Sequence, residues 1–248
     1  NLNRYDESSA DSIIRFATKL EGQTLRTACN VTSSEFHMNG KGGFGKMVER
    51  CYFKYEPNSS KNPDFEVAGL ELKCSPLKIL KNGEFRSKEK LIMNIIDYAE
   101  VHKETFDKSA FLRKNSHLLL VFYLHDKNLD MVDYPVKLVA NWRYTRDDLE
   151  IIERDWETIT QKIRNGQAHK LSESDTLCLG ATVKGSTALN SLRKQPFNVA
   201  EAKQRAYSLK QCYVNHIIWS IAQEKSFKET FGKSLEGYRK TWSNKGRI

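Results

Sequence analysis

The feature that most constrains the fold is an unbroken apolar run, LLLVFYL, at residues 118–124. Seven residues are far too few to cross a bilayer as a helix, which takes about 20. A continuous run of this length is typical of a strand that is buried rather than half-exposed. The run therefore predicts a buried strand near the middle of a sheet.

The remaining periodicity predicts a mixed α/β fold. Apolar residues at helical spacing predict helices at 11–20, 44–53 and 213–223, and a long helix that begins at Thr145 or Asp147 and stops near Gly166. Strands are expected at residues 64–74, 117–124 and 136–144, with shorter candidates at 176–182 and 205–209.

Neither a repeat nor a Pro/Gly-rich linker divides the chain, so we expect one domain over residues 1–248. The chain begins without Met, as expected for a piece excised from a longer two-domain protein. The N-terminus has no secretory signal, and the five cysteines are scattered without a zinc-binding spacing. We therefore expect a soluble cytoplasmic protein that has no disulfide scaffold or structural zinc.

The charge balance favours a polyanionic partner. Lys and Arg number 40 against 31 Asp and Glu, which leaves a net charge of +9 among 248 residues. Such an excess favours nucleic acid first. The alternative is charge that serves only solubility.

A glycine-rich segment, GKGGFGK at residues 40–46, fits two nucleotide-binding patterns, GxGxxG and GxxxxGK. The residues before it do not form a convincing buried strand, and Met47 stands where a phosphate loop needs a Ser or Thr hydroxyl. The segment is better explained as a flexible turn that lets a helix start close to another part of the backbone.

One group of residues has the composition of a phosphodiesterase site. Glu71 and Lys73 follow Asp64, and strand alternation would put both on one face, with Leu72 and Cys74 pointing into a core. Two carboxylates can hold Mg²⁺ while the ion keeps several waters, one of which it acidifies. A neighbouring lysine can orient the attacking water and offset charge on the phosphate.

Flanking residues add to this group. Glu49 would supply a third carboxylate if the helix at 44–53 packs against the strand. A basic segment downstream offers phosphate contacts: Lys78, Lys81, Arg86, Lys88 and Lys90. The alternative is a half-exposed strand with a solvent-facing Glu and Lys pair, a pattern that a charged chain produces by chance.

The order of these motifs resembles the MutH group of DNA endonucleases. The matching motifs are Lys41-x3-Gly45-x3-Glu49, Pro63-Asp64-Phe65 and Gly69-Leu70-Glu71-Leu72-Lys73. Further matches extend the resemblance over about residues 15 to 215. Three segments, at 82–89, 192–196 and 202–210, are more similar to the GATC-cutting restriction endonucleases of the Sau-three-A type.

This resemblance implies a restriction endonuclease-like, PD-(D/E)XK fold, in which helices flank a mixed sheet and two lobes form a clamshell around a DNA cleft. It also implies that Asp64 and Glu71 hold the metal and that Lys73 is the catalytic lysine. Glu49 and Lys41 are implied as supporting active-site residues.

The resemblance further implies base reading around Lys184 and in the segment 205–210. In that segment Arg205, Ser208 and Lys210 are the candidates, and we expect a DNA-facing edge there.

Two departures from MutH bear on base reading. MutH has an arginine where Thr182 stands, so readout is expected to shift to a neighbour such as Arg193. It also has a tyrosine, implicated in sensing the N6-methyl group of adenine, where Ser208 stands. We therefore expect adenine-methylated GATC to be cut about as well as unmethylated GATC.

The leading hypothesis is a magnesium-dependent type II restriction endonuclease domain that cuts double-stranded DNA at GATC. We expect it to act in the bacterial cytoplasm, as a monomer or a DNA-induced dimer, and not to associate with a membrane. One alternative is a MutH-like nicking enzyme of mismatch repair. The other is a DNA-binding module without catalysis, although the chain retains the full catalytic set.

Overall fold

The structure is a computed structural model that describes residues 5–30, 43–58, 60–81, 83–185 and 191–224. It divides into two compact units. The first comprises residues 1–89, 117–142 and 215–248, and the second comprises 90–116 and 143–214. Each unit has its own sheet.

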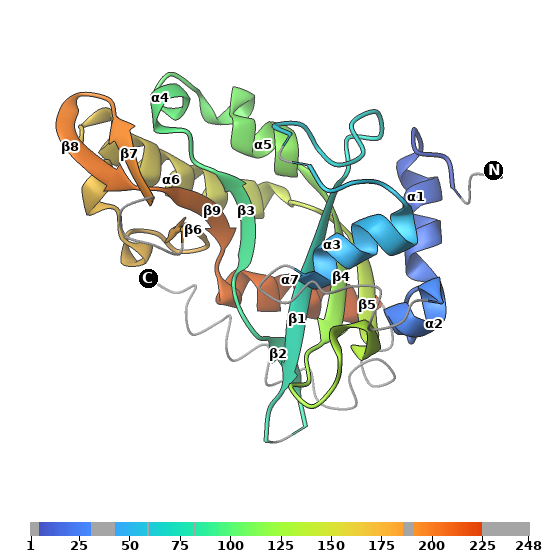
Figure 1. The fold of residues 1–248 in the computed structure, drawn as a ribbon. Coiled ribbons are helices and arrows are strands. Elements are labelled where there is room, and N and C mark those ends of the chain that lie inside the picture. Colours follow the sequence, from blue (N-terminus) through green and yellow to red (C-terminus); the bar gives the residue numbers. More distant parts are fainter. Residues whose placement is uncertain (1–4, 31–42, 59, 82, 186–190, 225–248) are drawn as a thin grey trace. The chain divides into compact units, whose positions relative to one another are not determined.

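The sheet of the first unit has the strand order β2-β1-β4-β5 (Figure 1). The strands are β1 (Glu71–Ile79), β2 (Phe85–Ser87), β4 (His117–Leu124) and β5 (Val136–Arg143). β1 pairs in parallel with β4 and antiparallel with β2, which makes the sheet mixed. Residues 118–122 of β4 are 0% exposed, so the predicted buried strand is confirmed.

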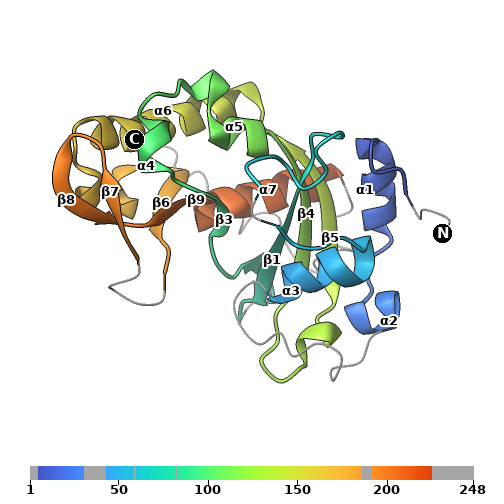
Figure 2. The ribbon, with the colours of Figure 1, turned by 45° about the horizontal axis from the view of Figure 1, so that its top comes forward.

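Helices lie on both sides of this sheet (Figures 1 and 2). On one side, α3 (Gly43–Met47) continues as a π-helix, Val48–Phe53, and shares a buried cluster with Leu72 of β1 and Val121 of β4. α1 (Ala10–Thr18) packs into the same cluster. On the other side runs α7 (Gln211–Glu224), where Asn215 accepts a hydrogen bond from the backbone N–H of Ser87. The predicted helices at 11–20, 44–53 and 213–223 are therefore confirmed.

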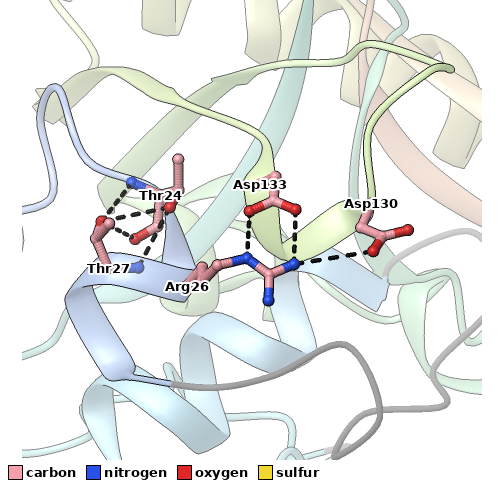
Figure 3. Close-up of polar contacts among 5 residues, drawn as sticks. All are labelled: Thr24, Arg26, Thr27, Asp130 and Asp133. Carbon is pink, nitrogen blue, oxygen red and sulfur yellow. Dashed lines mark hydrogen bonds and ion pairs between the residues drawn. The ribbon is translucent and has the colours of Figure 1, made fainter.

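A bidentate ion pair anchors the short helix α2 (Leu25–Cys29) to the connection between β4 and β5 (Figure 3). Arg26 donates to both carboxylate oxygens of Asp133, at 2.6 and 2.7 Å. The hydrogen bond from Arg26 holds the pKa of Asp133 below its ordinary value, against a smaller opposing effect of burial. Thr24 caps the helix by accepting from the backbone N–H of Thr27.

The second unit contains an antiparallel sheet in the order β3-β9-β6 and a separate hairpin, β7–β8. The strands are β3 (Leu91–Ile95), β6 (Leu179–Val183), β7 (Leu192–Gln195), β8 (Asn198–Lys203) and β9 (Arg205–Leu209). The helices are α4 (Tyr98–Val101), α5 (Ala110–Asn115) and α6 (Arg146–Arg164). Thr145 caps α6 and Gly166 follows its end with a φ of 66°, both as predicted.

The structure corrects two expectations. The strand expected at 64–74 begins only at Glu71, because Phe65 and Leu70 pair across a tight reversal. The segment at 205–209 is not an edge: β9 is the central strand of its sheet and all of its residues are buried. Among the described residues, no helix is long and apolar enough to cross a membrane.

Asp155 joins α6 to the start of β6. Its buried carboxylate accepts three backbone N–H groups, from Leu177 at 2.8 Å, Cys178 at 2.5 Å and Leu179 at 2.7 Å. The donors of Cys178 and Leu179, both 0% exposed, would lie buried and unsatisfied without it. The carboxylate therefore fixes α6 to the start of β6, and no local sequence pattern predicts this contact.

We expect Asp155→Ala to lower the free energy of unfolding by about 3 kcal/mol, because it leaves buried donors without an acceptor. Asp155→Asn keeps one acceptor oxygen and should cost less. Urea unfolding of these variants measures the difference. Glu153→Ala, at an exposed position of the same helix, should change stability by no more than about 0.5 kcal/mol. Equal stability of Asp155→Ala and Glu153→Ala would contradict the assignment.

Candidate active site

A tight reversal brings Asp64 back against the first residues of β1. The backbone groups of Phe65 and Leu70 exchange hydrogen bonds of 3.0 and 3.1 Å, and Gly69 turns the chain with a φ of 62°. An L side chain rarely adopts that conformation, so a glycine suits the position. This reversal explains why the two carboxylates, seven residues apart, lie side by side.

The two acidic residues are tied together through the backbone. The N–H of Asp64 donates to Glu71 Oε2 at 3.0 Å, and the N–H of Leu72 donates to Asp64 Oδ2 at 3.0 Å. Each carboxylate thus keeps a fixed orientation, and one oxygen of Asp64 has no hydrogen bond to the described residues. Such fixed carboxylates can hold a cation without rearranging.

Glu71 is buried, with 1% of its surface exposed, and Lys73 Nζ donates to its Oε1. The two side chains therefore share a face of β1, as the alternation predicts, while Leu72 points into the core. The alternative of a solvent-facing Glu and Lys pair is wrong, because Glu71 is buried. A carboxylate this deeply buried needs a compensating charge, which Lys73 supplies.

Glu49 joins this group from the π-helix. Burial raises its pKa to about 7, the negative charge of Asp64 adds to the rise, and Lys73 opposes it. Burial, together with the negative charges of Glu49 and Asp64, also raises the pKa values of Tyr55 and Cys74. Three carboxylates close enough to influence one another leave an excess of negative charge that a divalent cation would offset.

The donor set fits Mg²⁺. The described residues contain no group of three or more His, Cys, Asp or Glu side chains arranged to hold a metal ion. Mg²⁺ does not require such a group, because it commonly binds through one or two carboxylates and keeps several waters. Asp64 and Glu71 meet that requirement. Lys41, the other expected supporting residue, lies outside the described residues, as do Gly40 and Gly42 of the glycine-rich segment.

The basic segment downstream spans the β1–β2 hairpin and the three residues after β2. Lys78, Lys81 and Lys88 are exposed. Arg86 is half-buried, with its guanidinium 3.8 Å from the Glu84 carboxylate, and Lys90 forms an ion pair with Glu173. The three exposed lysines are therefore the members of the segment best placed to meet a phosphate backbone.

Most base-reading candidates on the second sheet have internal partners. Arg205 is buried and donates to the backbone oxygens of Ala181 and Leu171 at 2.5 Å each. Lys210 donates to the backbone oxygens of Glu173 and Thr176. Contact of Arg205 or Lys210 with DNA would require these bonds to break.

The other candidates on this unit differ in exposure. Ser208 is 0% exposed, and its hydroxyl lies 2.7 Å from that of Thr182. Arg193 is exposed on β7 and donates to Gln204 Oε1 at 3.1 Å, while Lys184, at the end of β6, is half-buried. Glu173 was not foreseen from the sequence, because its partners Lys90 and Thr182 lie 83 and 9 residues away.

Comparisons with known proteins show what the chain is similar to. Residues 53–155, which include Asp64, Glu71 and Lys73, match the family model described as DNA mismatch repair enzyme MutH. Over 195 residues the chain is 40% identical to the type II restriction enzyme Sau3AI of Staphylococcus aureus. The aligned region covers 78% of the chain and 40% of that enzyme. The chain is 24% identical over 188 residues to the DNA mismatch repair protein MutH of Shewanella woodyi, covering 74% of the chain and 79% of that protein.

Residues 53–155 therefore match the MutH family model, and the resemblance expected from the motifs is confirmed. A similar match, 21% identical over 180 residues, is to MutH of Shewanella baltica. The chain spans about two-fifths of the length of Sau3AI and about four-fifths of the MutH proteins it matches.

We expect Lys73→Met to lower the free energy of unfolding by about 2–3 kcal/mol, because it leaves the buried Glu71 carboxylate without its ammonium partner. The double variant Glu71→Gln/Lys73→Met removes the charge too and should recover part of that loss. Chemical denaturation of the two single variants and the double variant gives the coupling energy. Lys103→Ala, which breaks an exposed ion pair with Glu100, serves as control. Losses that simply add in the double variant would contradict the pairing.

Proposed function

We propose that this chain is the catalytic domain of a type II restriction endonuclease, which uses Mg²⁺ to hydrolyse phosphodiester bonds of double-stranded DNA at GATC. The observation that carries the proposal is the hydrogen-bonded group of Asp64, Glu71 and Lys73. The 40% identity with Sau3AI supports a restriction enzyme in particular.

Each residue of the group has a distinct task in this proposal. Asp64 and Glu71 would hold Mg²⁺, which when bound supplies a Lewis acid and an acidified water. Lys73 orients the attacking water and offsets the charge that grows on the phosphate. Glu49, whose pKa lies near neutrality, supports the site from the π-helix together with Lys41.

DNA contact is assigned to both units. In the first, Lys78, Lys81 and Lys88 meet phosphates, with Arg86 beside them. In the second, Lys184 and Arg193 read bases and Thr182, Arg205, Ser208 and Lys210 shape that surface. We expect the two units to act as the lobes of a clamshell around the DNA, in a cytoplasmic bacterial enzyme that works as a monomer or a DNA-induced dimer.

A second candidate function is nicking in mismatch repair. It is favoured by one observation: the chain covers 79% of MutH from S. woodyi but only 40% of Sau3AI. Digestion of a supercoiled plasmid in Mg²⁺ separates the candidates. Linear product with ends at GATC supports the restriction enzyme, and open circles support the nicking enzyme. DNA retardation in Ca²⁺ with no cleavage in Mg²⁺ would refute both.

We expect Asp64→Asn, Glu71→Gln and Lys73→Met to reduce the cleavage rate by at least about 100-fold, because each removes a group that acts on the metal, the water or the phosphate. Affinity for DNA, measured in Ca²⁺, should persist, since it depends mainly on cations that meet phosphates. Chemical denaturation shows which of these variants remain folded. A folded Lys73→Met protein that cuts at the normal rate at neutral pH would refute the assignment.

Base reading and phosphate contact should respond differently to salt. We expect Lys184→Ala to lose about 1–3 kcal/mol of discrimination between GATC and other sequences. Single changes of Lys78, Lys81 or Lys88 to Ala should instead weaken binding to all sequences, and each should reduce the slope of log K against log [salt] by about one unit. Salt titrations on a GATC duplex and a scrambled duplex test this. A uniform loss in Lys184→Ala would contradict its role in readout.

We also expect adenine-methylated GATC to be cut about as fast as the unmethylated site. Rejection of a methyl group requires a side chain that clashes with it. Ser208 is short and fully buried beside Thr182, so it presents nothing to crowd the methyl group. Single-turnover cleavage of unmethylated, hemimethylated and fully methylated duplexes measures the effect. A large loss of rate on the fully methylated duplex would refute this expectation.

A further inference from the structure

One face of the β6–β9 pair is polar. Gly180 pairs with Ser208, and a Cβ added to Gly180 would meet Ser208 Oγ at 3.2 Å and Lys210 Cε at 3.3 Å. Thr182, two residues after Gly180, bonds the Ser208 hydroxyl from the same face. Lys184 directly follows β6, two residues after Thr182, and its backbone N–H still bonds the neighbouring segment at Gln204, so continued alternation places it on this face. We call this set the polar face: Gly180, Thr182, Lys184, Ser208 and Lys210.

The carboxylate of Glu173 joins the polar face from a short 3-10 turn, Glu173–Asp175. Its Oε1 accepts from Lys90 Nζ and, at 3.0 Å, from the Thr182 hydroxyl. Lys210 donates to the backbone oxygen of Glu173 at 2.5 Å, so the turn itself is tied to the polar face. Burial opposes ionisation of Glu173, but Lys90 and Thr182 outweigh it and keep the pKa of the carboxyl below its ordinary value.

The second carboxylate oxygen, Oε2, has no hydrogen-bond partner among the residues that the structure describes. The side chain is 42% exposed, so this oxygen is an acceptor held in a fixed place at the surface. An ionised carboxylate only accepts hydrogen bonds, and phosphates repel it. The donors that double-stranded DNA offers in its major groove are exocyclic amino groups, N4 of cytosine and N6 of adenine.

We propose that Glu173 is a specificity-determining residue, which accepts a hydrogen bond from an exocyclic amino group of the recognition sequence. Lys90 and Thr182 hold the carboxylate in position and partly offset its charge, so that it costs less phosphate affinity. This inference rests on the proposed function, because it assumes that the polar face meets DNA.

The test measures binding of wild type, Glu173→Ala and Glu173→Gln to three duplexes in Ca²⁺. One duplex carries unmodified GATC, one has pyrimidin-2-one in place of cytosine, and one has purine in place of adenine. Each replacement deletes one amino group. We expect one deletion to weaken wild-type binding by about tenfold. Glu173→Ala should bind unmodified GATC about tenfold more weakly and lose all sensitivity to that deletion. The duplex that shows this coupling identifies the base.

Glu157→Ala is the matched control, because Glu157 is 46% exposed and forms an ion pair with Arg164 at 3.1 Å in the same unit. Its sensitivity to both deletions should equal that of wild type. Glu173→Gln preserves the size of the side chain and one acceptor, so with an unchanged melting temperature it should fall between wild type and Glu173→Ala.

The outcomes separate the two proposals. Full wild-type sensitivity to both deletions in folded Glu173→Ala would overturn the role of Glu173 and leave the endonuclease proposal intact. If Glu173→Ala does not fold, undiminished sensitivity in folded Glu173→Gln would overturn it in the same way. A wild type that binds GATC no better than a scrambled duplex would overturn the proposed function itself.

Discussion

The burial of the Glu71 carboxylate is the constraint on which the first unit depends. β1 runs beside the buried residues 118–122 of β4 with Leu72 in the core, and Glu71 on its other face is also buried, with 1% of its surface exposed. A carboxylate in such a place requires compensation, which Lys73 and the N–H of Asp64 supply. The fold therefore assembles two carboxylates and an amine before any ligand arrives, and their mutual repulsion favours a cation.

In the second unit, by contrast, several charged side chains already have hydrogen-bond or ion-pair partners within the protein. Arg205 and Lys210 satisfy backbone oxygens, Lys90 pairs with Glu173, and Asp155 satisfies the start of β6. The net charge of +9 thus overstates the cations available to a phosphate backbone. In the proposed function, attraction for DNA would come from exposed lysines such as Lys78, Lys81 and Lys88, and discrimination between sequences would come from the polar face.

The sequence predicts those elements whose signal is local. The apolar run at 118–124, the cap at Thr145 and the alternation after Leu70 each depend on neighbours in the chain, and they predict the strand, the helix and the shared face of Glu71 and Lys73. The strand was expected to begin too early, at residue 64, because an apolar residue such as Phe65 fits a strand as well as a turn. The bonds of Glu173 could not be predicted, because they join residues that only the tertiary fold brings together.

The claim that Asp64 and Glu71 form a cation site is tested most directly by metal binding without catalysis. Mn²⁺, which shares the preference of Mg²⁺ for carboxylate and water oxygens, can be titrated into the protein with a GATC duplex and followed by electron paramagnetic resonance. The account predicts bound Mn²⁺ in the wild-type protein and its loss in folded Asp64→Asn and Glu71→Gln. Equal binding of Mn²⁺ by all three proteins would contradict it.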